Sequence, residues 1–243
     1  MLILGHRGAA FDAPENTIVA IYEGLKQGAD GVEVDIRLSL DNKVVVIHDN
    51  TFKRTGKIKD SVCKSHSSFI KEIDVGSFKS EKFIGEKVPF LSEVLDIVPK
   101  GKLIQIEIKN GIKSVPFLLQ DIKSSTKSID EIMIIGFCKK AMKKVKEEMP
   151  KIKVAWINGE KSKLNSNIQS SFDLIKICKE NNFNGIDFDC RFNIDEKFTK
   201  EFINNGLEIY SWTIDDIEKA KYYKDIGIFG IATNRPKYII ENL

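Results

Sequence analysis

Gly31-Val32-Glu33-Val34-Asp35-Ile36-Arg37 is the stretch of this 243-residue chain that decides the fold. Apolar and charged residues alternate in it, so the two-residue period of a β-strand places Glu33 and Asp35 together on one face. Two neighbouring carboxylates in an otherwise apolar strand are costly to bury unless a cation pairs with them. The stretch therefore predicts a buried strand whose acidic face binds a cation.

Two of the three histidines end segments that have the apolar character of buried strands. His6 ends Leu2-Ile3-Leu4-Gly5-His6, before the acidic strand, and His48 ends Val44-Val45-Val46-Ile47-His48, after it. Imidazoles exchange protons near neutral pH. Two of them beside a carboxylate pair that binds a metal indicate a hydrolytic site.

A third strand, Leu103-Ile104-Gln105-Ile106-Glu107-Ile108-Lys109, adds another carboxylate. Its period places Glu107 on the face that we expect to lie beside Glu33 and Asp35. Three carboxylates form an oxygen-rich site for one hard divalent ion, Mg²⁺ or Ca²⁺. Zinc fits less well, because no cysteine or close histidine pair joins the cluster.

Two basic residues lie near this acidic set. Glu107 taken alone is better explained by an inter-strand ion pair with Lys109 or Arg7. Taken together, however, the three acids favour a metal, because Arg7 and Lys109 supply only two positive charges. We expect Arg7 and Lys109 to hold the non-bridging oxygens of a phosphate ester bound at the metal, since a guanidinium fork and an ammonium group both suit such oxygens.

The composition excludes several classes of protein. The chain has 38 basic and 35 acidic residues and a net charge of +3, which argues against a nucleic-acid or membrane partner and leaves a small-molecule substrate. An N-terminus that enters a strand at once predicts a cytoplasmic protein. No CxxC spacing occurs, so free thiols in a reducing compartment are expected for the four cysteines, Cys63, Cys138, Cys178 and Cys190.

The fold class follows from eight strands that alternate with helices, which predicts a single (β/α)8 TIM barrel over residues 1–243. The alternative is a doubly wound open sheet, which should carry a GxGxxG loop after its first strand. Gly5-His6-Arg7-Gly8 does not match that pattern. The predicted strands span residues 2–6, 31–37, 102–109, 131–137, 152–157, 185–189, 207–212 and 228–233.

Residues 50–89 interrupt the alternation and are interpreted as a small insertion subdomain after the second strand and its hairpin extension. Loops in α/β units usually run about 2–6 residues, so this one is unusually long. It would stand on the carboxyl rim of the barrel. Its phenylalanines form either a mini-core or an apolar lip over a substrate; they are Phe52, Phe69, Phe78, Phe83 and, just beyond it, Phe90.

The chain resembles the glycerophosphodiester phosphodiesterase family in the order and spacing of seven short motifs. Each motif alone is weak evidence, whereas the ordered set is strong and extends over the whole chain. The motifs are His6-Arg7-Gly8, Pro14-Glu15-Asn16-Thr17, Glu33-Val34-Asp35, His48-Asp49, Glu107-Ile108-Lys109, Ser211-Trp212-Thr213 and Thr233-Asn234-Arg235-Pro236.

The resemblance implies a barrel enzyme with one divalent metal that hydrolyses glycerophosphodiesters to glycerol 3-phosphate and an alcohol. It also implies roles for individual residues. They are an acid–base pair of His6 and His48, metal ligands Glu33, Asp35 and Glu107, and phosphate contacts Arg7 and Lys109.

Two positions leave the rim of the pocket open to interpretation. Trp212 is either part of the barrel core or a flat wall against the glycerol carbons. Asn234 stands where the family more often has aspartate, which bears on the rim rather than on the chemistry.

Two alternative functions remain open. One is a lysophospholipase D-type enzyme, with an apolar groove opened by the insertion, and the other is a non-catalytic glycerophosphodiester-binding module.

Overall fold

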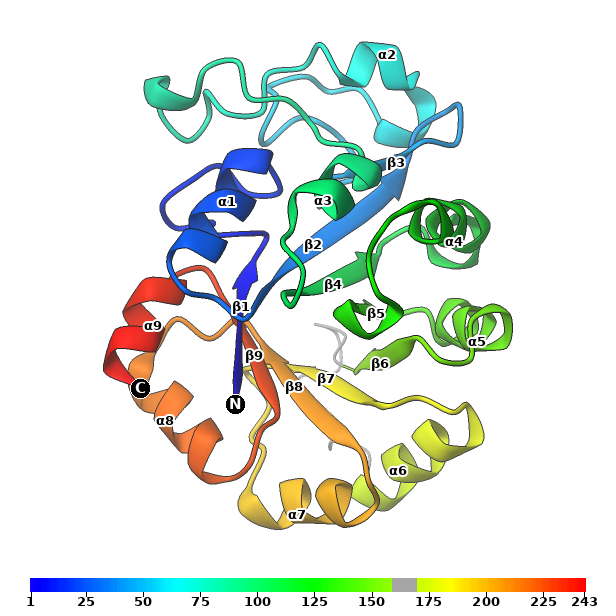
Figure 1. The fold of residues 1–243 in the computed structure, drawn as a ribbon, viewed down its shortest axis with the longest axis vertical. Helices are drawn as coiled ribbons and strands as arrows, with labels where there is room; N and C mark the ends of the chain where they lie inside the picture. The colour runs from blue at the N-terminus through cyan, green and yellow to red at the C-terminus, as the bar shows by residue number, and fades with distance from the viewer. Residues whose placement is uncertain (159–169) are drawn as a thin grey trace.

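The computed structural model describes residues 1–158 and 170–243. In this part of the chain nine strands form one sheet in the order β1-β9-β8-β7-β6-β5-β4-β2-β3, and β1 also pairs with β2, which closes a barrel (Figure 1). The pairings between neighbouring barrel strands are parallel. The barrel strands are β1 (Leu2–His6), β2 (Gly31–Leu38), β4 (Leu103–Ile108), β5 (Ile132–Gly136), β6 (Lys153–Asn158), β7 (Gly185–Asp189), β8 (Glu208–Trp212) and β9 (Gly230–Thr233).

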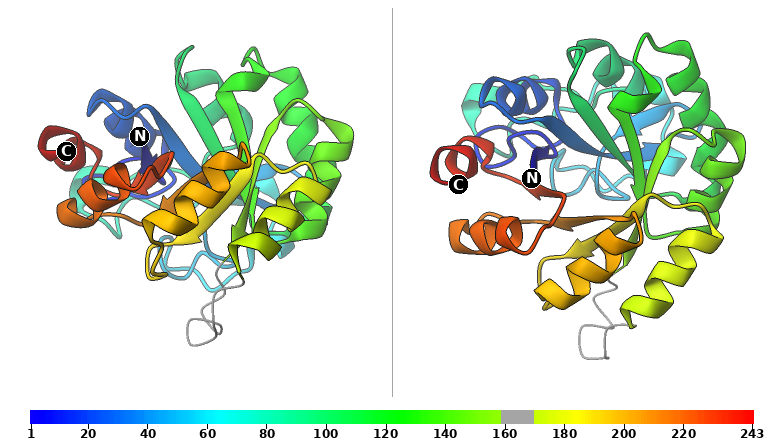
Figure 2. Two further views of the ribbon diagram at one scale, coloured as in Figure 1. Left: turned by 90° about the horizontal axis from the view of Figure 1, so that it is seen from below. Right: turned by 60° about the horizontal axis from the view of Figure 1, so that its bottom comes forward.

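Helices surround the strands, as Figure 2 shows from two further directions. The predicted TIM barrel is thereby confirmed, and the open doubly wound sheet is wrong. The helices are α1 (Ile18–Lys26), α2 (Ser67–Ile70), α3 (Leu91–Ile97), α4 (Val115–Ser124), α5 (Lys139–Glu148), α6 (Ser171–Glu180), α7 (Glu196–Asn204), α8 (Ile217–Asp225) and α9 (Pro236–Asn242).

Alternation along the strands divides the barrel into two apolar layers. The outward residues of β2, such as Val32 and Val34, join the large core between strands and helices. An inner cluster that contains Met133, Ile157 and Tyr210 fills the barrel lumen. Because both faces of a parallel strand are buried, the acidic residues of β2 point into the barrel and not to bulk solvent.

Helix ends follow the local chemistry of their sequences. Asp195 and Asp216 accept hydrogen bonds from backbone N–H groups in the first turns of α7 and α8. Gly206 and Gly227 follow the same two helices with φ of +70° and +86°, a conformation that favours glycine. These caps end the helices before β8 and β9 and keep the connections to the strands short.

The insertion lies between β3 (Val44–Val46), which pairs antiparallel with β2, and α3. We call residues 50–89 the insertion segment. It is built from short turns and helices, and Figure 1 shows it beside α1 and beyond β3. Eight buried residues form a separate apolar cluster that joins β3 to the segment: Val45, Ile47, Phe52, Val62, Ile70, Ile73, Val75 and Val88.

The phenylalanines of this region have different surroundings. Phe52 is fully buried in that cluster and Phe90 packs against it, as a mini-core predicts. Phe83 is buried in another cluster, which contains Ala13 of the loop before α1. Phe69 is 43% exposed. The phenylalanines thus serve mainly to pack the segment.

Candidate active site

Three carboxylates from two adjacent strands form the centre of the site. Glu33 and Asp35 lie on β2, Glu107 lies on β4, and Asp35 is in register with Glu107. Each side chain offers an oxygen that lies within 4.8 Å of the others, and all three residues are buried. The strand period that suggested their proximity in the sequence therefore brings them together at the carboxyl ends of the strands.

Two cations contact this acidic cluster. Arg7 Nε lies 3.1 Å from Asp35 Oδ2, and Lys109 Nζ lies 3.0 Å from Asp35 Oδ1 and 2.5 Å from Glu107 Oε1. Glu33 accepts a hydrogen bond from the backbone N–H of Arg7 at 3.0 Å. Two positive charges thus neutralise only part of a set of three buried acids.

The pKa values reflect this imbalance. Burial, together with repulsion from Asp35 and Glu107, raises the pKa of Glu33 well above its usual value. Burial also raises the pKa of Glu107 to about 7, although Lys109 opposes the shift. At Asp35 burial acts in the same direction, but Lys109 and Arg7 outweigh it and lower the pKa. A divalent cation among these oxygens would favour all three ionised forms, so the donor set fits such an ion.

His6 ends β1 and is oriented by a chain of hydrogen bonds. Its Nδ1 lies 2.8 Å from Asn234 Oδ1, and Asn234 Nδ2 donates to Asp215 Oδ2 at 2.7 Å. Because the amide oxygen can only accept, His6 carries its proton on Nδ1 and presents Nε2, 3.9 Å from Glu33 Oε2. Burial and the neighbouring Arg7 lower the pKa of His6 to about 4, so the imidazole is neutral at pH 7.

His48 follows β3 and has a carboxylate partner. Its Nδ1 donates to Asp49 Oδ1 at 2.7 Å, so Nε2 is the ring nitrogen that remains for proton transfer. The backbone carbonyl of His48 accepts a hydrogen bond from Arg37 Nε at 2.7 Å. Burial lowers the pKa of this imidazole, while Asp35 acts to raise it. Both histidines are thus oriented through Nδ1.

The Pro14–Thr17 motif supports the site more than it starts a helix. Only Thr17 caps α1, and Asn16 instead exchanges two hydrogen bonds with Asp35, at 2.8 Å and 3.1 Å. Glu15 accepts from Arg7 Nη1 at 2.8 Å. Arg7 and Asn16 adopt positive φ angles of 53° and 59°, a conformation that is uncommon for residues other than glycine.

Other supporting residues were not found from the sequence. Asn234 was assigned to the pocket rim, yet it contacts the ring of His6 directly, 228 positions away along the chain. Asp215 supports Asn234 from the loop after β8. Only the family motif around Asn234 carried a signal for this contact.

Trp212 ends β8 and lies half-buried at the mouth of the barrel. It packs against the inner apolar cluster and meets Phe137 edge to face, with ring centroids 6.3 Å apart. Phe137 follows β5 and is 39% exposed.

Deeper in the barrel, burial and the nearby Glu107 raise the pKa of Asp187 well above its usual value. Asp187 Oδ1 has no hydrogen-bond partner in the described ranges.

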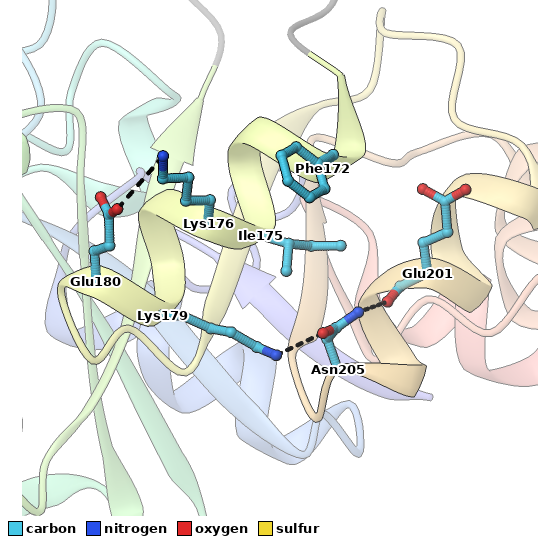
Figure 3. Close-up of a pocket in the computed structure, with 7 residues that line it drawn as sticks. All are labelled: Phe172, Ile175, Lys176, Lys179, Glu180, Glu201 and Asn205. Atoms are coloured by element: carbon cyan, nitrogen blue, oxygen red, sulfur yellow. Dashed lines mark hydrogen bonds and ion pairs between the residues drawn. The ribbon is translucent and has the colours of Figure 1, made fainter.

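A pocket of about 630 Å³ lies elsewhere, on the outer side of the barrel between α6 and α7 (Figure 3). Its lining includes Phe172, Ile175 and Lys179 of α6 and Glu201 of α7. None of the lining residues belongs to the acidic cluster or to the two histidines. This pocket is therefore separate from the candidate active site.

A closed eight-stranded barrel with acids, imidazoles and cations at the carboxyl ends of its strands has the architecture of a TIM-barrel enzyme. Residues 6–238 match the model of the glycerophosphoryl diester phosphodiesterase family. The chain belongs to this family of phosphoric diester hydrolases.

No helix in the described ranges has the length and apolar character needed to cross a membrane.

Known proteins of this family resemble the chain over almost its full length. It is 30% identical to a glycerophosphodiester phosphodiesterase of Caldanaerobacter subterraneus, with 98% of this chain and 96% of the relative covered. Its fold is similar to an Oleispira antarctica phosphodiesterase solved with the product sn-glycerol-3-phosphate (TM-score 0.90, 22% identity, 100% and 96% covered). A Thermotoga maritima glycerophosphodiester phosphodiesterase is also similar (TM-score 0.83, 24% identity, 99% and 97% covered).

Proposed function

We propose that this enzyme hydrolyses glycerophosphodiesters to glycerol 3-phosphate and an alcohol with the help of one divalent cation, Mg²⁺ or Ca²⁺. The observation that carries the proposal is the cluster of Glu33, Asp35 and Glu107, three buried carboxylates with oxygens within 4.8 Å of one another. These residues would hold the cation. When bound, it would polarise a phosphoryl oxygen and neutralise charge that develops in the transition state.

The chain's own residues would perform the remaining steps. Arg7 and Lys109 would bind phosphoryl oxygens and share the stabilisation of the developing charge. One of His6 and His48 would accept a proton at Nε2 from the nucleophile, which is water or the glycerol hydroxyl of the substrate. The other, protonated at Nε2 as well as at Nδ1, would donate its Nε2 proton to the leaving alkoxide. Trp212 would lie against the glycerol carbons.

The test is an assay of several glycerophosphodiesters that differ in headgroup, with and without added metal, which measures release of glycerol 3-phosphate. Metal-dependent release is expected. Faster turnover of lysophosphatidylcholine than of glycerophosphocholine would favour a lysophospholipase D-type enzyme instead. The burial of Phe52 and Phe83 does not favour that alternative, because it takes these two rings out of any apolar lip over a substrate. Binding of a glycerophosphodiester without release of product would indicate a non-catalytic module.

The cytoplasmic location of the protein stays a prediction.

We expect the loss of Asn234 to slow the reaction through His6. Asn234→Ala removes the acceptor that fixes the imidazole, and loss of such a supporting hydrogen bond typically costs about 10–100-fold in activity. The measurement is kcat with glycerophosphocholine. Asn242→Ala, at the exposed end of α9, is the matched control and should leave kcat unchanged. An unchanged kcat for Asn234→Ala would show that His6 needs no such support.

We propose that the insertion segment forms a small subdomain that covers the candidate active site. Replacement of residues 50–89 by a short Gly-Ser loop should raise KM or change the substrate range while the barrel still folds, because six of the eight residues in the apolar cluster that joins the segment to β3 belong to the segment. Kinetics and circular dichroism measure the two effects. Loss of all folded structure would show instead that the segment belongs to the barrel core.

A further inference from the structure

Arg54 of the insertion segment binds two carboxylates at the edge of the site. Its Nε donates to Asp49 Oδ2 at 2.8 Å. Its Nη1 and Nη2 donate to the two oxygens of Glu15 at 2.5 Å and 2.8 Å. One guanidinium therefore joins three parts of the chain: the insertion segment, the residue after His48 and the loop between β1 and α1.

Each of these two carboxylates also holds a side chain of the site. Asp49 accepts the Nδ1 proton of His48 at 2.7 Å, and Glu15 accepts from Arg7 Nη1 at 2.8 Å. Two short chains of hydrogen bonds thus start at Arg54. One ends on an imidazole that we assign to proton transfer, and the other ends on a guanidinium that we assign to phosphate binding.

The contacts of Arg54 depend on the shape of its head group. A planar guanidinium can bind one carboxylate through two parallel N–H groups and still donate Nε–H to a second carboxylate, whereas an ammonium group is a point charge. The Arg54 side chain is 43% exposed. Exposed ion pairs contribute little to the free energy of folding, so loss of these contacts should affect the orientation of the site more than the stability of the fold.

We propose that Arg54 is a positioning residue for this active site: it holds Asp49 against His48 and Glu15 against Arg7, and so couples the insertion segment to both proton transfer and phosphate binding. The inference rests on the proposed function for its kinetic consequences. Burial raises the pKa of Asp49, but hydrogen bonds from Arg54 and His48 bring it to about 2, which agrees with an ionised bridge.

The kinetic test compares Arg54→Gln, Arg54→Lys and the control Lys53→Ala, whose side chain is exposed beside Arg54. Arg54→Gln should lower kcat about 10–100-fold and raise KM, because a small displacement of catalytic groups has effects of this size. Arg54→Lys should recover part of the loss. Lys53→Ala should behave as the wild type, with all melting temperatures nearly equal.

Double mutants show whether Arg54 acts through its two partners. If it does, Arg54→Gln should lower kcat no further in an Asp49→Asn background and raise KM no further in a Glu15→Gln background. Additive losses in both backgrounds would overturn the proposal. Unchanged kcat and KM in Arg54→Gln would do the same.

A substrate-free measurement separates this inference from the proposed function. In protein labelled with ¹⁵N-histidine, Arg54→Gln should speed exchange of the His48 Nδ1–H with water several-fold. The His6 Nδ1–H, which is bonded to Asn234, should be unaffected and serves as the internal control. An unchanged His48 exchange rate would overturn the positioning role. If the wild type cleaves no glycerophosphodiester, the proposed function fails, and this exchange rate alone decides the role of Arg54.

Discussion

Removal of divalent cations should abolish hydrolysis of glycerophosphodiesters, and added Mg²⁺ or Ca²⁺ should restore it. The physical reason is the charge of the cluster, in which Arg7 and Lys109 bring two positive charges to three buried carboxylates. Replacement of one ligand by an amide, as in Asp35→Asn or Glu107→Gln, should reduce the rate to near background at ordinary metal concentrations. The measurement is initial rate after treatment with a chelator and after titration with each metal.

The same cluster predicts a change in stability that needs no substrate. A cation that binds only the folded cluster should raise the melting temperature, and at a concentration a hundred times Kd it should stabilise the fold by about 2.7 kcal/mol. Glu180→Gln, at an exposed position of α6, is the matched control and should keep both effects. A chelated enzyme with full rate would exclude a required metal.

The barrel and its acidic centre could be predicted because both depend on local periodicity. A two-residue period places Glu33 and Asp35 on one face of β2, and parallel pairing then brings β4 and Glu107 beside them. The proximity of these three residues thus requires only the strands and their order. The predicted bounds of β1 and β7 agree with the structure, and those of the other six barrel strands differ by at most two residues at either end, a range that is ordinary for element boundaries.

The support of the histidines could not be predicted, because it depends on contacts between distant parts of the chain. Asn234 reaches His6 only because barrel closure pairs β9 with β1. Arg54 reaches Glu15 across 39 positions from a segment without regular strands. No periodic pattern encodes such contacts, and an asparagine or arginine in a loop is indistinguishable from a solvated residue until the fold is known.

We expect His6→Ala and His48→Ala each to lower the rate by about 10²–10⁴-fold, the range for loss of a general acid or base. Both rings are held through Nδ1 and present Nε2, the geometry that proton transfer needs. The measurement is kcat with glycerophosphocholine at saturating metal. Metal affinity should change little, because the ion would be held by carboxylates.

The control for these variants is the third histidine. His66 lies in the insertion segment with an exposed side chain, so His66→Ala should keep the wild-type rate. If His6 and His48 were only packing residues, their alanine variants would lose stability while the folded fraction kept near-normal turnover. Thermal melting with active-site titration distinguishes these two results.

A substrate with a good leaving group should separate the two roles. An aryl phosphodiester scarcely needs protonation of the departing oxygen, so the variant that lacks the general acid should recover much of its rate on this substrate. The variant that lacks the base should not, because the nucleophile must still lose its proton. Equal recovery in His6→Ala and His48→Ala, or recovery in neither, would contradict opposite roles. A full rate of either variant on glycerophosphocholine would remove that histidine from the mechanism.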